Sequence, residues 1–146
     1  AAQLEKENDD YTAILVKSVA DRVAEALAEW MHLEFRRNMG SAENFTPEEL
    51  IAEKYRGIRP APGYAACPDH QLKLDIWKLL SGHTNSVELT ESLSMTPPSS
   101  VSGFLFHHEQ AKYFRVEQIA DDQVKNLAQK RGSATEEKRR WLAFQP

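Results

Sequence analysis

The chain has 146 residues, of which 41% are hydrophobic and 27% are charged, a balance typical of a globular protein large enough to bury a core. A formal net charge of -4, without a basic stripe carrying interleaved aromatic residues, argues against a nucleic-acid binder. No apolar run approaches a membrane span, no signal peptide is evident, and the single cysteine excludes an internal disulfide, so we expect a cytoplasmic protein that binds no membrane.

Residues 8–38 have the periodicity of one long amphipathic helix. Asn8 lies where an N-cap is favoured, and Asp21, Glu25 and Glu29 form an acidic row that is typical of a solvated helix face. Apolar residues recur at the spacings expected of one buried face: Tyr11, Ile14, Leu15, Val19, Val23, Ala26, Leu27, Trp30 and Phe35.

A second helix is predicted to begin at Thr46 and to run to about residue 55. Thr46 suits the N-cap, Pro47 suits the first helical position, and Glu49 completes a capping box. The helix leads into residues 55–70, which read Y-R-G-I-R-P-A-P-G-Y-A-A-C-P-D-H. Because prolines and glycines are dense in this stretch, neither a helix nor a central strand can run through it, and we expect a stiff loop.

This loop can present one preformed surface built from Arg59, the backbone amides near Ala61 and Gly63, and the ring of Tyr64. An arginine fork can hold a carboxylate with two hydrogen bonds, and a tyrosine ring offers a face for stacking. The surface therefore suits a small polar ligand that carries a carboxylate and a flat ring. The same composition also suits a rigid connector between two helices.

Cys67 and His70 form a C-x-x-H pair, but no second pair is present to complete the four ligands of a zinc site. We therefore predict no metal and no cysteine nucleophile. Cys67 is interpreted as a packing residue and His70 as a hydrogen-bonding group that orders the loop. Residues 71–80 read as a third helix. Its inner face is predicted to comprise Leu72, Ile76, Leu79 and Leu80.

From residue 86 onward the period changes to that of β-strands, because β-branched and aromatic residues become frequent. We predict strands at residues 87–89, 101–106 and 113–119, with the last two forming an antiparallel hairpin. Two further helices are predicted, one at residues 121–131 and one beginning at residue 135. Helices that flank a small antiparallel sheet give an α+β class.

The run R-P-A-P-G-Y-x-x-C-P-D-H at residues 59–70 resembles the S-adenosylmethionine-binding signature of the C-terminal reactivation domain of cobalamin-dependent methionine synthase. Ordered matches along nearly the whole chain accompany it: D-D-Y-x-x-I (9–14), A-D-R-V-A-E-A-L-A-E (20–29), E-E-L-I-A-E-K-Y-R-G-I (48–58), L-T-E-S (89–92), S-V-S-G-F-L-F (100–106), K-Y-F-x-V (112–116) and D-Q-V-K (122–125).

The resemblance implies which residues bind S-adenosylmethionine. Arg59 would hold the carboxylate, while Glu25 in the A-E-A motif and Tyr113 in K-Y-F would contact other ligand groups. The backbone around Gly63 would surround the adenosyl part. The full set implied by the resemblance is Glu25, Arg59, Ala61, Gly63, Tyr64 and Tyr113. The domain would contribute no catalytic acid, base or nucleophile.

The reaction implied by the resemblance is the reductive methylation of cob(II)alamin, which reactivates methionine synthase in methionine biosynthesis. S-adenosylmethionine would supply the methyl group to a cobalamin held by a partner domain. A flavodoxin-like or reductase partner would supply the electron. We do not expect this chain alone to be catalytically complete.

Residues 1–146 are expected to form a single domain or the C-terminal part of one. The family's domain is longer, and its N-terminal half includes an aspartate that also contacts the ligand. The chain begins with Ala rather than Met, which suits a processed or engineered piece. The site would then be open on one side, so we expect this chain alone to bind the ligand weakly.

Two other functions fit the sequence. The chain could be a docking module for a cobalamin-binding domain or a flavodoxin, without binding S-adenosylmethionine itself. It could also be a free-standing S-adenosylmethionine protein of another use. Basic residues in the predicted C-terminal helices would face an acidic flavodoxin, or would simply form solvated helix faces: Lys125, Lys130, Arg131, Lys138, Arg139 and Arg140.

Overall fold

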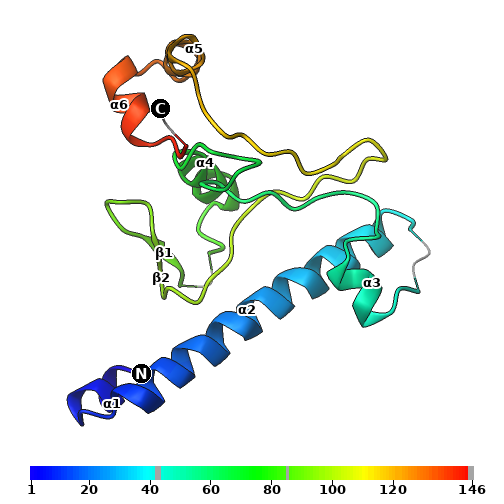
Figure 1. Cartoon of the computed structure of the whole chain (residues 1–146), viewed down its shortest axis with the longest axis vertical. Helices are drawn as coiled ribbons and strands as arrows, with labels where there is room; N and C mark the ends of the chain where they lie inside the picture. Colours follow the sequence, from blue (N-terminus) through cyan, green and yellow to red (C-terminus); the bar gives the residue numbers. More distant parts are fainter. Residues whose placement is uncertain (42–43, 85, 145–146) are drawn as a thin grey trace. The chain divides into compact units, whose positions relative to one another are not determined.

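A computed structural model describes residues 1–41, 44–84 and 86–144. The chain divides into two units, unit 1 with Ala1–Glu43 and Asn85–Val101, and unit 2 with Asn44–Thr84 and Ser102–Pro146. Within the described ranges, helices and one small antiparallel sheet are the regular elements (Figure 1), which confirms the predicted α+β class.

Unit 1 contains the short helix α1 (Ala2–Lys6) and the long helix α2 (Asp10–Asn38). The long helix was predicted from residue 8, but Asn8 has a φ of 59°, which no helix interior allows. Asp9 is the N-cap instead, and its Oδ1 accepts a hydrogen bond from the Thr12 amide at 3.1 Å. This bond and the adjacent positive end of the helix dipole favour Asp9 as the N-cap, one residue after Asn8, and α2 begins at Asp10.

The apolar face of α2 is exposed, contrary to the prediction that it would be buried. Tyr11 is 79% exposed and Val23 is 61% exposed, while the buried residues of this helix are Ala13, His32 and Arg36. Periodicity shows that a helix has a face suited to burial, but it does not show which surface covers that face.

The sheet of unit 1 pairs β1 (Glu88–Leu89) with β2 (Met95–Thr96). The register is antiparallel, with Glu88 opposite Thr96 and Leu89 opposite Met95. The first of the three predicted strands is thus present as β1. Its partner is a segment that we did not predict as a strand.

The second and third predicted strands, at residues 101–106 and 113–119, are absent from the structure as regular strands, so the predicted hairpin is wrong. The first of these segments pairs with the proline-rich loop instead: the Phe104 amide donates to the carbonyl of Pro60 at 3.0 Å. Pro60 and Pro62 have no N–H to return, so a continuous ladder cannot form along this loop.

Unit 2 begins with α3 (Pro47–Ile51), which has the predicted capping box. The Thr46 hydroxyl accepts from the Glu49 amide at 3.3 Å, and the Glu49 carboxylate accepts from the Thr46 amide at 3.1 Å. The helix is shorter than predicted. Glu53 adopts a φ of 51°, and this left-handed residue ends the helical path before residue 55.

Three further helices follow in unit 2: α4 (Leu72–Leu80), α5 (Asp121–Arg131) and α6 (Thr135–Arg140). All three agree closely with the predicted ranges. The inner face of α4 is narrower than expected, because Leu79 is 78% exposed. None of the helices in the described ranges is long and apolar enough to cross a lipid bilayer.

The core of unit 2 lies where the C-terminal segment meets α5. Ile119, Val124 and Leu142 are buried together, and Val116 and Leu127 pack against them. Burying side chains of this size stabilises the unit by roughly 1.5–3 kcal/mol each. The core therefore ties the segment before α5 to the segment after α6.

Candidate functional site

The loop that carries most of the predicted ligand-binding residues is anchored by short backbone pairings. Ile58 and Phe106 exchange two hydrogen bonds, with the Ile58 amide donating at 3.0 Å and the Phe106 amide donating at 2.9 Å. A Cβ on Gly103 would lie 2.8 Å from the Pro60 carbonyl oxygen, so only glycine allows this close approach. These contacts fix the backbone on both sides of Arg59.

Arg59 itself is held by two tyrosines. Its backbone amide donates to the hydroxyl of Tyr113 at 2.9 Å. Its guanidinium donates to the hydroxyl of Tyr55, with Cζ 5.8 Å from the centroid of the Tyr55 ring. The structure thus brings together two predicted site residues, Arg59 and Tyr113, that stand 54 positions apart in the sequence.

Tyr55 is a site residue that the sequence reasoning missed. It was identified only as the start of the loop, although it stands four residues before Arg59. That spacing was a weak signal, since such residues become neighbours only if the chain turns between them. The turn occurs here, and Tyr55 is buried while its hydroxyl orients the guanidinium.

A tight turn presents the next part of the predicted surface. The Gly63 amide donates to the Cys67 carbonyl at 2.7 Å, and the Cys67 amide donates to the Tyr64 carbonyl at 2.8 Å. The Tyr64 amide donates to the Ala61 carbonyl at 3.3 Å. The turn leaves the Tyr64 side chain 70% exposed, which is the placement expected of a stacking surface.

His70 supports this turn from within. Gly63 has a φ of +97°, and a Cβ there would lie 2.2 Å from Cε1 of the His70 ring. Partial burial lowers the pKa of His70, the positive charge of Lys73 lowers it further, and Asp69 acts in the opposite direction. The neutral form of the ring is therefore favoured against the glycine.

The environment of Cys67 in this turn disfavours the thiolate form. Burial raises the pKa of the Cys67 thiol, and the charge of Asp69 raises it further, so the unreactive thiol form is favoured. No group of three or more His, Cys, Asp or Glu residues in the described ranges is arranged to hold a metal ion.

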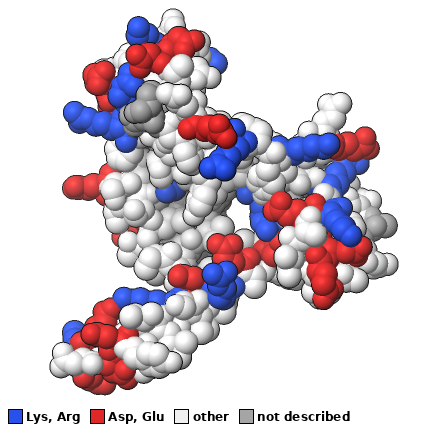
Figure 2. Space-filling view, viewed as in Figure 1, with Lys and Arg blue, Asp and Glu red and all other residues white. Residues whose placement is uncertain are grey.

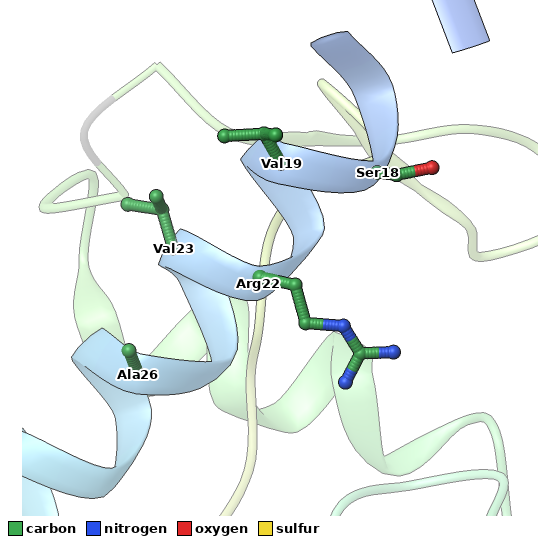
Figure 3. A pocket seen from close by; sticks show the side chains of 5 residues that line it. All are labelled: Ser18, Val19, Arg22, Val23 and Ala26. Atoms are coloured by element: carbon green, nitrogen blue, oxygen red, sulfur yellow. The ribbon is translucent and has the colours of Figure 1, made fainter. Parts of the chain in front are cut away.

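Glu25 belongs to the other unit, on α2, and its side chain is exposed. Asp21, one helical turn earlier in the same acidic row, accepts a hydrogen bond from the Ser99 hydroxyl at 2.6 Å. A shallow hollow of about 350 Å³ lies on the same helix and is lined by Ser18, Val19, Arg22, Val23 and Ala26 (Figure 3). The two valines project to one side of α2 and the arginine to another, so this hollow is largely apolar and includes no predicted ligand-binding residue.

Three of the C-terminal cations expected to face a partner are engaged within the chain. Arg131 pairs with Asp75 of α4. Lys138 is buried and pairs with Asp69. Arg139 pairs with Asp121 at 2.7 Å, which lowers the pKa of the Asp121 carboxyl. The interpretation of Lys138 as a solvated or partner-facing residue is therefore wrong, because its ammonium is needed inside unit 2.

Known proteins share both the sequence and the fold of this chain. Residues 1–132 match the family described as vitamin B12-dependent methionine synthase, activation domain. The structure is similar to a crystal structure of the MetH reactivation domain bound to AdoHcy, with 48% sequence identity over 96% of this chain and a TM-score of 0.90. This chain covers 44% of that solved chain, which is less than half of its length.

The helices and proline-rich loop are therefore those of a methionine synthase reactivation domain. The chain belongs to the activation-domain family of vitamin B12-dependent methionine synthase, which confirms the resemblance found in the sequence. The complete enzymes of this family are methyltransferases.

Proposed function

We propose that this chain binds S-adenosylmethionine and supports the reductive methylation of cob(II)alamin in a cobalamin-dependent methionine synthase. The observation that carries the proposal is the double support of Arg59 by Tyr55 and Tyr113, next to the exposed ring of Tyr64. The 48% identity to a reactivation domain whose crystal structure holds AdoHcy supports the ligand class, because AdoHcy is S-adenosylmethionine without its transferred methyl group.

Each proposed contact follows from the chemistry of the side chain. The Arg59 guanidinium, oriented by Tyr55, would form a charge-assisted pair with the ligand carboxylate. The backbone of Ala61, Gly63 and Tyr64 would surround the adenosyl part. Glu25 and Tyr113 would hold other ligand groups, as proposed from the matching motifs. We propose no catalytic acid or base among these residues.

The role of these residues would be to position the ligand, not to react with it. A cobalamin-binding partner domain would bring cobalt to the sulfonium methyl, and the methyl would pass from sulfur to cobalt, with one electron supplied by a flavodoxin-like or reductase partner. Holding two reactants in the right geometry can account for a large part of such a barrier. The raised pKa of the Cys67 thiol is consistent with a site that offers no nucleophile of its own.

Calorimetric titration of the chain with S-adenosylmethionine tests the proposal. We expect saturable binding, and we expect Arg59→Ala to weaken it by about tenfold or more, because a charged hydrogen-bonding partner of the ligand is lost. Arg56→Ala is the matched control, since Arg56 is a neighbouring exposed arginine whose partner is Glu109 at 3.5 Å.

Circular dichroism checks that the wild-type chain is folded. If the folded chain does not bind S-adenosylmethionine, the proposal is contradicted for this chain alone. Equal losses in the Arg59 and Arg56 variants would show that general charge, not the clamped fork, governs binding. Removal of the Tyr55 hydroxyl by Tyr55→Phe provides a milder variant, which keeps the ring over the guanidinium.

Docking of protein partners is the second candidate function, and it is also a proposal. On the face seen in Figure 2, positive and negative side chains are interspersed, with lysines and arginines reaching outward beside acidic residues. Lys125 and Lys130 on α5 and Arg140 at the end of α6 are exposed. These cations are suited to guiding an acidic flavodoxin-like partner, whereas Lys138 is not.

A further inference from the structure

A buried cation joins the last helix to the proposed ligand loop. Lys138 stands in a run of three basic residues at the end of α6, yet its side chain is only 1% exposed. Its ammonium pairs with Asp69, whose side chain is 13% exposed, and also donates to Gln71 Oε1 at 2.9 Å. Lysine is rarely buried unless it is paired, so this lysine is held in place by specific partners.

Asp69 and Gln71 flank His70, and the segment after α6 lies alongside them. The second carboxylate oxygen of Asp69 accepts from the Gln71 amide at 3.0 Å. The His70 amide donates to the Trp141 carbonyl at 2.9 Å. In Figure 1 this contact appears where the red C-terminal segment reaches the green loop ahead of α4. The side chain of Asp69 and the backbone of His70 are therefore both held by residues of the C-terminal segment.

His70 extends this restraint to the turn that the ligand is proposed to meet. Its ring fills the space that a Cβ on Gly63 would occupy, with the ideal Cβ position 2.2 Å from Cε1. Gly63 in turn bonds to Cys67. A continuous series of contacts thus runs from the ammonium of Lys138 through Asp69 and His70 to the backbone at Gly63.

A buried ion pair is weak grounds for stability, because the cost of desolvating two charges offsets their attraction, and its best attested use is to select one arrangement. We propose that Lys138 is a positioning residue for the adenosyl ligand: through Asp69 and Gln71 it holds His70 against Gly63 and fixes the loop backbone. This inference rests on the proposed function, because the ligand is the one named there.

The test compares four variants with the wild-type chain. Lys138→Met removes the ammonium and keeps an unbranched chain of similar length. The double variant Lys138→Met, Asp69→Asn also removes the carboxylate that would be left buried and unpaired. Lys138→Arg keeps a cation. Arg140→Met is the matched control, because Arg140 is an exposed basic residue of the same helix.

Two measurements are made on each variant: hydrogen exchange of backbone amides without ligand, and calorimetric affinity for S-adenosylmethionine. In Lys138→Met we expect exchange at Gly63 and Cys67 to accelerate by about tenfold or more relative to Ala128 inside α5, and the affinity to fall by a similar factor. The double variant should regain thermal stability but keep fast loop exchange and weak binding. Lys138→Arg should recover most of both properties, and Arg140→Met should change neither.

The positioning role is overturned if Lys138→Met accelerates exchange equally at Gly63 and Ala128, because that result describes a purely global structural contribution. It is also overturned if the folded variant binds with wild-type affinity. If the wild-type chain binds no S-adenosylmethionine, yet loop exchange still responds selectively to Lys138, the proposed function fails for this chain while the control of the loop by Lys138 is supported.

Discussion

Arg59 is supported at both its backbone and its side chain by hydroxyl groups. Tyr113 accepts from the backbone amide at 2.9 Å, and Tyr55 accepts from the guanidinium. Tyr113 therefore serves the fold through its hydroxyl, and the ligand contact proposed for it falls to its ring. A fork oriented in this way loses less side-chain freedom when it binds a carboxylate, which is the physical advantage of a preorganised arginine.

His70 gives the loop a pH dependence whose sign follows from its environment. The pKa of His70 is lowered from its ordinary value of 6.5, first by burial and then by Lys73. Between the lowered pKa and about 6.5, the unfolded chain binds more protons than the folded chain does. The contribution of this residue to the free energy of unfolding is therefore complete above about pH 6.5 and is lost as the pH falls below it.

We expect the free energy of unfolding of the wild-type chain to fall more steeply than that of His70→Gln as the pH is lowered from about 7 to about 5. Denaturant unfolding at a series of pH values measures both curves, and their difference isolates this residue from other titrating groups. Parallel curves for the two proteins would show that the histidine titrates alike in the folded and unfolded chains.

Individual site residues were predictable to different degrees. Arg59, Gly63 and Tyr64 stand in one short proline-rich stretch, so their shared surface could be inferred from the sequence. Tyr55 and Lys138 could not be assigned in the same way. Their contacts with Arg59 and Asp69 depend on a turn and on the return of the C-terminal segment, neither of which leaves a periodic signal.

At the scale of elements, the turn of residues 63–67 depends on a glycine at its first position. An alanine at Gly63 would combine a φ of +97° with a Cβ only 2.2 Å from the His70 ring. At Gly82, which has a φ of +87°, nothing lies within 4 Å of the added carbon. Comparing Gly63 with Gly82 therefore separates the effect of backbone strain from the effect of steric overlap.

We expect Gly82→Ala to lower the free energy of unfolding by about 1 kcal/mol, through backbone strain alone, and Gly63→Ala to lower it by about 2–4 kcal/mol. Thermal and denaturant unfolding measure both values. If steric overlap with His70 causes the larger loss, the double variant Gly63→Ala, His70→Ala should recover part of it. Equal losses at the two positions would instead mean that His70 moves aside at little cost.

The elements themselves show which sequence signals were sufficient. The capping box at Thr46 predicted the start of α3 because this signal is local. Residues 101–106 and 113–119 have β-like composition but form no regular strand. The first segment bonds to the loop at Phe104 and Phe106, and the loop prolines cannot continue this pairing into a ladder. Contacts with the rest of the chain determine the conformation of these two segments, and the propensity of their own residues could not predict it.

At the scale of the whole molecule, the exposed lysines of α5 allow a test of partner docking. We expect Lys125→Glu combined with Lys130→Glu to weaken binding of a flavodoxin-like protein by about tenfold at low ionic strength, with the effect shrinking at high salt. Lys78→Glu, an exposed reversal on α4, is the control. Surface plasmon resonance at several salt concentrations measures the affinity of each variant for the flavodoxin-like protein. An unchanged affinity in the double variant would exclude α5 from the docking surface.

The family itself was predictable from the sequence because ordered motifs extend through both units, and the match over residues 1–132 confirms it. The relative contribution of the two units to ligand binding was not predictable. Glu25 lies on α2 and the other proposed contacts lie in unit 2, while the solved relative is more than twice as long as this chain's matched share. Binding measurements on this chain will report what these two units achieve without further polypeptide.

The exposed apolar stripe on α2 also has a consequence for behaviour in solution. Water around Tyr11, Val23 and their neighbours is displaced whenever two such surfaces meet, so this stripe favours association between copies of the chain. Sulfate and phosphate strengthen this tendency because they are excluded from protein surfaces, whereas mild chaotropes weaken it. We therefore expect the choice of salt to affect crystallisation and storage of the protein through the exposed apolar residues of α2.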